Sequence, residues 1–159
     1  MEIVTSDCLS LHLKERMPNA VTLTLAMRGM GDMSHGTAKT AIEAINRGTA
    51  TRRDGTIVFS KTPARRRLQF GDREVDCVGV SWGDVATAYY TTGIPNIAVY
   101  FESTKALEQI VGLPGFARWL LATTPGQAFL RRQIEKLPEG PDPEAQKTQV
   151  TQILGIVED

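Results

Sequence analysis

The dipeptide Asp54-Gly55 constrains the fold of this chain more than any other local feature of its sequence. It stands between two arms rich in β-forming residues, at positions 49–53 and 56–60. An Asp-Gly pair suits the type I′ turn, which needs positive φ at both central residues and matches the natural twist of paired strands. The sequence therefore predicts a β-hairpin over residues 49–60.

Several other segments have the composition and alternation of strands. From Ala20 to Met27 apolar side chains alternate with threonines and alanine, which predicts a half-buried strand of an antiparallel sheet. A strand pair is expected around the turn Gly71-Asp72. The remaining expected strands lie at residues 96–101 and 150–157.

Helical periodicity separates these strands along the chain. After a short extended piece at residues 2–4, Ser6 or Asp7 is expected to cap a helix that runs to about Arg16. Further helices are expected after an N-cap at Ser34, between an N-cap at Asp84 and an end at Gly93, and within residues 103–136.

These elements predict an α+β fold, with a mostly antiparallel β-sheet of five to seven strands and helices packed on it. The length of 159 residues, with 42% hydrophobic and 23% charged residues, is typical of one folded domain. We expect a single domain over 1–159, made of a sheet-rich core with two or three helices at 1–102, a helical segment at 103–136, a proline-rich loop at 137–149 and a terminal strand at 150–157.

The charge balance and hydropathy exclude several classes of partner. The 18 basic residues equal the 18 acidic ones, so the domain as a whole has no electrostatic attraction for nucleic acid. No apolar run approaches the roughly 20 residues that a membrane-spanning helix needs, and residues 1–5 lack the features of a signal peptide. We therefore expect a cytoplasmic protein without a membrane span.

Cysteine and histidine are too sparse and too scattered for a metal centre. Cys8 and Cys77 fit neither a disulfide framework nor a zinc-ligand spacing, and we expect both thiols to be reduced and mostly buried. His12 falls in the middle of a predicted helix, where a solvent-facing or packing role is expected. The phosphate-loop, dinucleotide-binding, metalloprotease and nucleophile-elbow motifs are all missing from the sequence.

A first candidate ligand site is the loop that leads into the second predicted helix. Free backbone N–H groups at a helix start favour a carboxylate or phosphate, and small or hydroxyl side chains let such a group approach and orient it. A plain N-cap with a glycine needed for packing explains the same residues and stays the alternative. The candidate residues are Ser34, His35, Gly36 and Thr37.

A second candidate site is the densest cluster of aromatic and hydroxyl side chains, residues 82–96. Aromatic residues with a polar group commonly line concave sites or interfaces, although they also anchor ordinary cores. Both interpretations stay open. The ligand-binding candidates in this cluster are Trp82, Asp84, Tyr89 and Tyr90.

A third candidate is a set of basic residues on the hairpin and on the segment that follows it. If they converge they would form an anion-binding face, for which the candidates are Arg52, Arg53, Arg65 and Arg67. A solvated sheet edge that charge protects from pairing is the favoured alternative.

Two blocks of the sequence, one within residues 4–40 and one within residues 82–97, resemble a known family. The resemblance rests on Val4 to Leu9, Leu25 to Gly29, Ser34 to Thr40, Trp82 to Tyr89 and Thr92 to Ile97. In this order and spacing they are similar to the second, non-Rossmann domain of saccharopine-dehydrogenase-like proteins, which include trans-acting enoyl reductase relatives. The resemblance implies a domain truncated at both ends, because the family carries a nucleotide-binding Rossmann domain before it.

The resemblance also implies site residues and a function. Ser34, Gly36 and Thr37 would face the nicotinamide and substrate cleft, with Asp7 nearby. Because the hydride carrier belongs to the nucleotide-binding domain, we expect no cofactor and no oxidoreductase activity from the chain alone. The expected function is a non-catalytic binding or assembly module, homodimeric through a sheet face or edge. The alternatives are the substrate-binding part of an NADP-dependent oxidoreductase completed by a separate nucleotide-binding chain, and a small-molecule carrier.

Overall fold

The structure is a computed structural model of the whole chain, and it describes residues 2–29, 48–135 and 150–159. The chain divides into two compact units. The first contains Met1–Arg28, Gly48–Ser103 and Gln152–Asp159, and the second contains Gly29–Arg47 and Thr104–Thr151. The expectation that residues 1–159 form a single domain stays a prediction.

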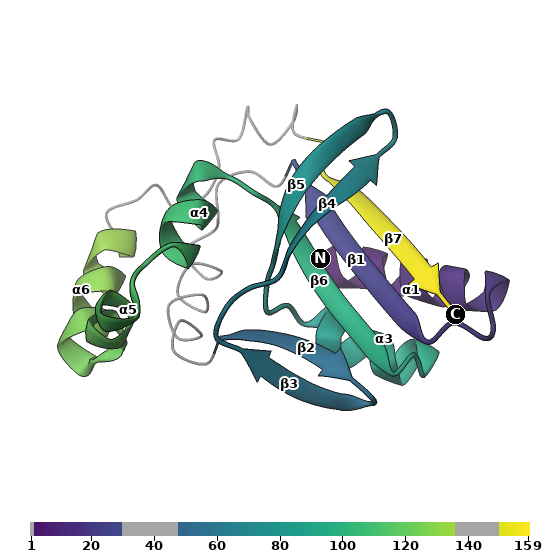
Figure 1. Cartoon of the computed structure of the whole chain (residues 1–159), viewed down its shortest axis with the longest axis horizontal. Coiled ribbons are helices and arrows are strands. Elements are labelled where there is room, and N and C mark those ends of the chain that lie inside the picture. The colour runs from purple at the N-terminus through teal and green to yellow at the C-terminus, as the bar shows by residue number, and fades with distance from the viewer. Residues whose placement is uncertain (1, 30–47, 136–149) are drawn as a thin grey trace. The chain divides into compact units, whose positions relative to one another are not determined.

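The first unit is built around a sheet that has seven strands in the described part of the chain (Figure 1). The strands are β1 (Thr22–Arg28), β2 (Thr49–Arg53), β3 (Thr56–Ser60), β4 (Arg65–Phe70), β5 (Arg73–Gly79), β6 (Asn96–Glu102) and β7 (Gln152–Glu158). Five of them follow the order β3-β2-β6-β1-β7, while β5 pairs with both β4 and β6. Strands β1 and β6 are parallel, and the other pairs are antiparallel. The predicted α+β fold with a mostly antiparallel sheet is confirmed.

Strand β6 organises the sheet because three strands pair with it. One edge of β6 pairs with β1 along almost its whole length. The other edge is shared: Ile97 pairs with Arg52 of β2, while Tyr100 to Glu102 pair with Gly79 to Cys77 of β5. The hairpins β2–β3 and β4–β5 therefore join the same edge of β6 at different points (Figure 1).

Both hairpins have two-residue turns. Asp54 and Gly55 both have positive φ, 47° and 76°, as a type I′ turn requires, which confirms the turn predicted for residues 49–60. In the second hairpin Gly71 has a φ of 64° and Asp72 completes the loop. Both turns follow from glycine placement that the sequence alone reveals.

Helices α1 (Glu2–Arg16) and α3 (Asp84–Thr92) supply the apolar side chains that pack on one face of the sheet. The buried cluster on this face contains Leu23, Leu25, Ile97 and Val99 from the strands and Val85 and Ala88 from α3. The extended piece expected at residues 2–4 is wrong, since α1 already begins at Glu2. The local preference of β-branched residues is worth only tenths of a kcal/mol, so the contacts of α1 with α3 and β7 override it.

The hairpin β4–β5 covers side chains on the opposite face of the sheet. Leu68, Phe70, Val75 and Cys77 form a second buried cluster with Ala26 and Tyr100. Thr24 and Ala26 are consequently buried as fully as Leu23 and Leu25. The expectation that β1 is half-buried is therefore wrong, because a long-range contact covers the face that alternation had assigned to solvent.

The ends of α3 correct one expectation and confirm another. Its N-cap is Gly83, which makes no side-chain capping bond, and Asp84 is the first helical residue rather than the cap. Its C-cap is Gly93, which has left-handed backbone geometry and donates its N–H to the carbonyl of Tyr89 at 2.8 Å. The expectation that Asp84 is the N-cap is therefore wrong.

The second unit contains α4 (Lys105–Val111), α5 (Gly115–Ala122) and α6 (Thr124–Glu135). Thr123 separates the last two, because its backbone is extended and its hydroxyl donates to the carbonyl of Leu120 at 2.6 Å. The helix expected after Ser34 and the loop expected at 137–149 lie outside the described residues. None of the helices within the described ranges is long and apolar enough to cross a membrane.

Candidate functional site

The candidate residues from the sequence do not lie in one site. Ser34, His35, Gly36 and Thr37 lie outside the described residues, so the expected anion site at a helix start stays a prediction. The aromatic cluster and the arginines all lie in the first unit.

The aromatic cluster does not present its side chains in one direction. Trp82 packs edge to face on Phe101 with ring centroids 5.0 Å apart, on the side of the first core cluster. Its Nε1 is buried and has no hydrogen-bond partner among the described residues. Tyr89 lies edge to face with Tyr90 at 6.0 Å, but the Tyr90 ring is exposed. Successive residues of a helix point in different directions, so a cluster in sequence is not a cluster in space.

Asp84 belongs to a buried polar group between α1 and α3. Its side chain is 0% exposed, and Oδ1 accepts a hydrogen bond from the Ser6 hydroxyl. Nearby, Asp7 Oδ2 accepts a hydrogen bond from the Thr91 hydroxyl at 2.8 Å. Each carboxyl group thus uses one oxygen to join the two helices.

The second oxygen of each carboxyl group has no such partner. Asp7 Oδ1 and Asp84 Oδ2 are buried without a hydrogen bond from any described residue. Burial raises the pKa of Asp84, the hydrogen bond from Ser6 lowers it, and the negative charge of Asp7 raises it again. On balance the pKa of Asp84 is raised, and the hydrogen bonds of the two carboxyl groups join α1 to α3.

Arg52 holds the β2–β3 hairpin against α3. The side chain is only 7% exposed, and Nε donates to the Val85 carbonyl at 2.9 Å. Its Nη1 donates to the carbonyl of Gly55 in the turn. The guanidinium also lies 4.1 Å from the centroid of the Tyr89 ring, close enough for a cation–π interaction. One buried cation thus joins a strand, a turn and a helix.

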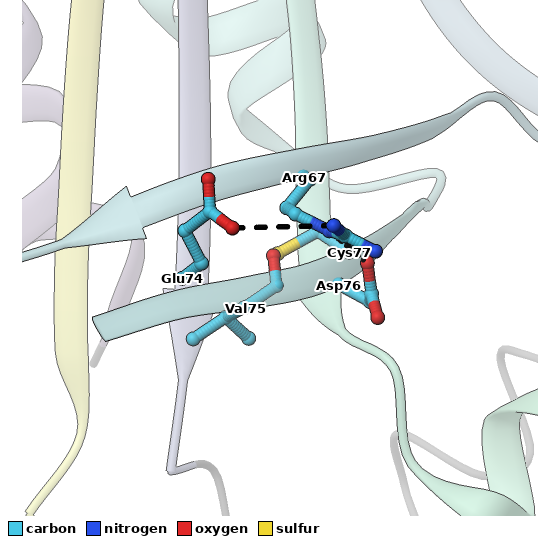
Figure 2. A network of polar contacts seen from close by, with 5 residues as sticks. All are labelled: Arg67, Glu74, Val75, Asp76 and Cys77. Carbon is cyan, nitrogen blue, oxygen red and sulfur yellow. Dashed lines mark hydrogen bonds and ion pairs between the residues drawn. The ribbon is translucent and has the colours of Figure 1, made fainter.

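Two surface arginines, Arg66 and Arg67, lie beside acids. Arg67 on β4 reaches across to β5, where its Nε lies 2.9 Å from Asp76 and its Nη1 lies 4.0 Å from Glu74 (Figure 2). Arg66 donates to the Thr24 hydroxyl at 3.1 Å and lies 3.9 Å from Glu158. Neighbouring carboxylates reduce the positive potential that an anion would meet.

The four anion-binding candidates occupy two different hairpins. Arg52 and Arg53 lie on β2, with only Arg53 exposed, whereas Arg65 and Arg67 lie exposed on β4. The two strands have no direct pairing in the sheet. Anion binding at these residues stays a prediction.

The cysteines and His12 behave differently from one another. Cys77 is buried on β5, and burial raises the pKa of its thiol to about 11, helped by the charges of Glu102 and Asp76. Cys8 is exposed on α1, so the expectation that both thiols are buried is wrong for it. His12 is exposed on the same helix. Among the described side chains, no group of three or more histidine, cysteine, aspartate or glutamate residues could hold a metal ion.

The outer strand β3 is a candidate surface that sequence reasoning located but did not single out. All five of its residues are exposed, including Ile57 at 38%, Val58 at 37% and Phe59 at 57%. The signal was present in the sequence, since residues 56–60 contain no charged side chain. Edge strands usually carry charge or proline that discourages pairing.

A second group of exposed apolar side chains lies on the helices of the other unit. Phe116, Trp119 and Leu120 are exposed on α5, and Phe129 is exposed on α6. The first three follow the spacing of one helix face. Each unit therefore presents apolar side chains to its surroundings.

Comparison with known proteins adds no family to this description. No protein-family model matches the sequence, and a search of the curated proteins finds no match. The resemblance to saccharopine-dehydrogenase-like proteins therefore stays a hypothesis carried by the residue blocks alone.

Proposed function

We propose that the chain is a non-catalytic assembly module that forms a homodimer. The observation that carries this proposal is the exposure of Ile57, Val58 and Phe59 on the outer strand β3. Apolar area gains about 25 cal/mol for each Å² that is removed from water, so these side chains favour a partner. Clustered exposed apolar residues commonly mark interaction sites.

The polar candidates Arg52 and Asp84 support the same proposal, because their contacts lie within the fold. Arg52 makes its contacts within the fold, to the Val85 and Gly55 carbonyls and the Tyr89 ring. Asp84 is fully buried and accepts its hydrogen bond from Ser6. Their contacts hold the hairpin and the helices in place. The exposed apolar side chains Ile57, Val58 and Phe59 are not used in these internal polar contacts.

The proposal is tested by the oligomeric state of the full chain in solution. We expect sedimentation velocity to show a dimer at tens of micromolar. Phe59→Thr keeps a β-forming residue but removes the exposed ring, so it should shift the equilibrium toward monomer. Tyr90→Gln is the matched control, because it removes an exposed ring from α3 and should leave the dimer intact. A monomer at every accessible concentration would overturn the proposed function.

A further inference from the structure

The hairpin geometry fixes which main-chain groups β3 offers to a partner. A type I′ turn joins Arg53 and Thr56 as a hydrogen-bonded pair, and such pairs alternate along an antiparallel ladder. The N–H and C=O groups of Thr56, Val58 and Ser60 therefore point toward β2. Those of Ile57 and Phe59 point outward, where none of the described strands pairs with them.

We propose that β3 of one copy pairs antiparallel with β3 of a second copy, with Val58 opposite Val58 at the two-fold axis. This inference rests on the proposed function, because it specifies how the dimer forms. Ile57 of each copy then lies opposite Phe59 of the other, and the sheet continues from one molecule into the next. The occupant of the exposed edge is thus a second copy of this chain.

The main-chain groups favour this register over its neighbours. The N–H and C=O groups of Ile57 and Phe59 point outward, so Ile57 of one copy and Phe59 of the other exchange two hydrogen bonds. The two-fold symmetry repeats this pair on the other side of Val58. A register centred on Ile57 would need the N–H of Gly55, which already donates to the Pro95 carbonyl at 2.9 Å. A register centred on Phe59 would need Lys61, which lies beyond the end of β3. Only the register centred on Val58 uses the whole strand.

The side chains agree with the same register. Ile57 opposite Phe59 pairs a β-branched side chain with an aromatic one, and Thr56 opposite Ser60 pairs two hydroxyl side chains. Both kinds of cross-strand pair are favourable. No charge opposes itself, because residues 56–60 are uncharged.

The other outer strands fit a second copy less well. Self-pairing of β4 would bring Arg65, Arg66 and Arg67 together with their own copies. Strand β7 has apolar residues, but Leu154 and Ile156 already pack on the second core cluster, so pairing there gains less. Among the described strands, β3 alone combines exposed apolar side chains with the absence of charge.

The register is tested by placing charge at its centre. Val58→Lys and Val58→Glu each set a charge opposite an identical charge, so each variant alone should raise the dimer dissociation constant at least about tenfold. An equimolar mixture places Lys opposite Glu, and we expect sedimentation to show the dimer restored. Circular dichroism spectra should match that of the parent chain, which checks that both variants are folded. Val21→Lys, at an exposed valine just before β1, is the matched control and should dimerise like the parent chain.

A cross-linking experiment tests the same contact without charge. Residues opposite each other in a non-hydrogen-bonded pair have Cα atoms about 4.5 Å apart, within the range of a disulfide. In a Cys8→Ser background, Val58→Cys should form a disulfide-linked dimer on oxidation. Thr56→Cys should not, because Thr56 does not meet its own copy in this register.

The possible outcomes separate the register from the proposed function. If the parent chain dimerises but the charged variants stay dimeric, the register is wrong and the assembly function stands. Failure of the mixture to restore the dimer, or of Val58→Cys to cross-link, likewise overturns the register alone. If the parent chain is monomeric, the assembly function itself is overturned.

Discussion

The two hairpins of the sheet begin from the same local pattern and end in different environments. Each has a two-residue turn, and each pairs its inner strand with the same edge of β6. Hairpin β4–β5 buries Leu68 and Phe70 in the second core cluster and carries arginines on its outer strand. Hairpin β2–β3 has an uncharged outer strand in which all five residues are exposed.

The difference shows that a hairpin can be held in two ways. Apolar side chains from both strands of β4–β5 pack into a core, so its hold on the unit is distributed over many contacts. Hairpin β2–β3 is held largely by polar contacts: Arg52 contacts the turn, α3 and the Tyr89 ring, and the turn N–H groups of Asp54 and Gly55 donate to Asn96 and Pro95. Because Arg52 is buried and makes several of these contacts, its loss should harm β2–β3 far more than loss of one surface arginine harms β4–β5.

Arg52→Ala should have the largest effect. It leaves the Val85 carbonyl without its charged donor in a buried place, so we expect the free energy of unfolding to fall by about 2 to 4 kcal/mol. Urea denaturation measures the change. Arg53→Ala, one residue further along and exposed, is the control and should change stability by less than about 0.5 kcal/mol. Equal effects of the two variants would contradict the role of Arg52 as a buried anchor of β2–β3.

The two turn glycines come next. Gly55→Val and Gly71→Val each force a β-branched residue into positive φ, which should cost about 1 kcal/mol or more in unfolding free energy. A Cβ at position 55 would lie 3.4 Å from the Tyr89 hydroxyl, an ordinary contact distance, and one at position 71 meets nothing within 4 Å, so the positive φ is the cause of the expected loss at both sites. Thermal melts should show a loss for both variants. An unchanged melting temperature for Gly55→Val would show that the type I′ turn does not constrain the β2–β3 hairpin.

The pH dependence of stability tests the helix on which Arg52 rests. Because burial raises the pKa of Asp84, this carboxyl group keeps its proton in the folded chain at pH values where the unfolded chain has released it. In the unfolded chain the release occurs at about pH 3.9. More protons are then bound in the folded state, so this group makes stability fall as pH rises through the interval between the two pKa values. Asp84→Asn keeps the acceptor for Ser6 and should remove that fall.

A second variant sharpens the same experiment. The hydrogen bond from Ser6 lowers the pKa of Asp84, so Ser6→Ala should extend the fall in stability to higher pH. Denaturation midpoints across the acidic range measure both variants. A parent chain and Asp84→Asn with the same pH profile would show that Asp84 does not titrate between folded and unfolded states.

Arg67→Gln should have the smallest effect. Arg67 is exposed, and its contacts with Asp76 and Glu74 are screened by water, so we expect the urea midpoint to stay within the error of the measurement (Figure 2). The contacts also weaken with added salt. A loss as large as that of Arg52→Ala would mean that surface charge, and not the apolar cluster, holds β4–β5.

Sequence reasoning was most successful where the cause of the structure is local. Asp54-Gly55 and Gly93 specify a turn and a helix end because positive φ is a property of single residues. It was less successful for Asp84, which the pattern of caps assigns to the helix start although its partner is Ser6, 78 positions away. The aromatic cluster shows the same limit, since Trp82 packs on the core side while Tyr90 faces water.

The candidate surface of β3 was visible in the sequence only in part. The absence of charge in residues 56–60 is a local fact, but an uncharged strand can equally be a central one. What makes β3 a candidate is its place at the end of the sheet, which depends on β2 and not β3 reaching β6. The exposure of a strand depends on which strands lie beside it, and that is decided by strand pairing.

The sequence by itself determined the turns, most of the described helices and strands and the α+β class of this protein, because periodicity and glycine geometry act within a few residues. Only the tertiary structure decided that β1 is covered on both faces, that Arg52 is a buried anchor and that β3 is an open edge. Each of these depends on segments that are distant in the chain, and pairing between distant segments is selected by the burial that the whole sheet achieves.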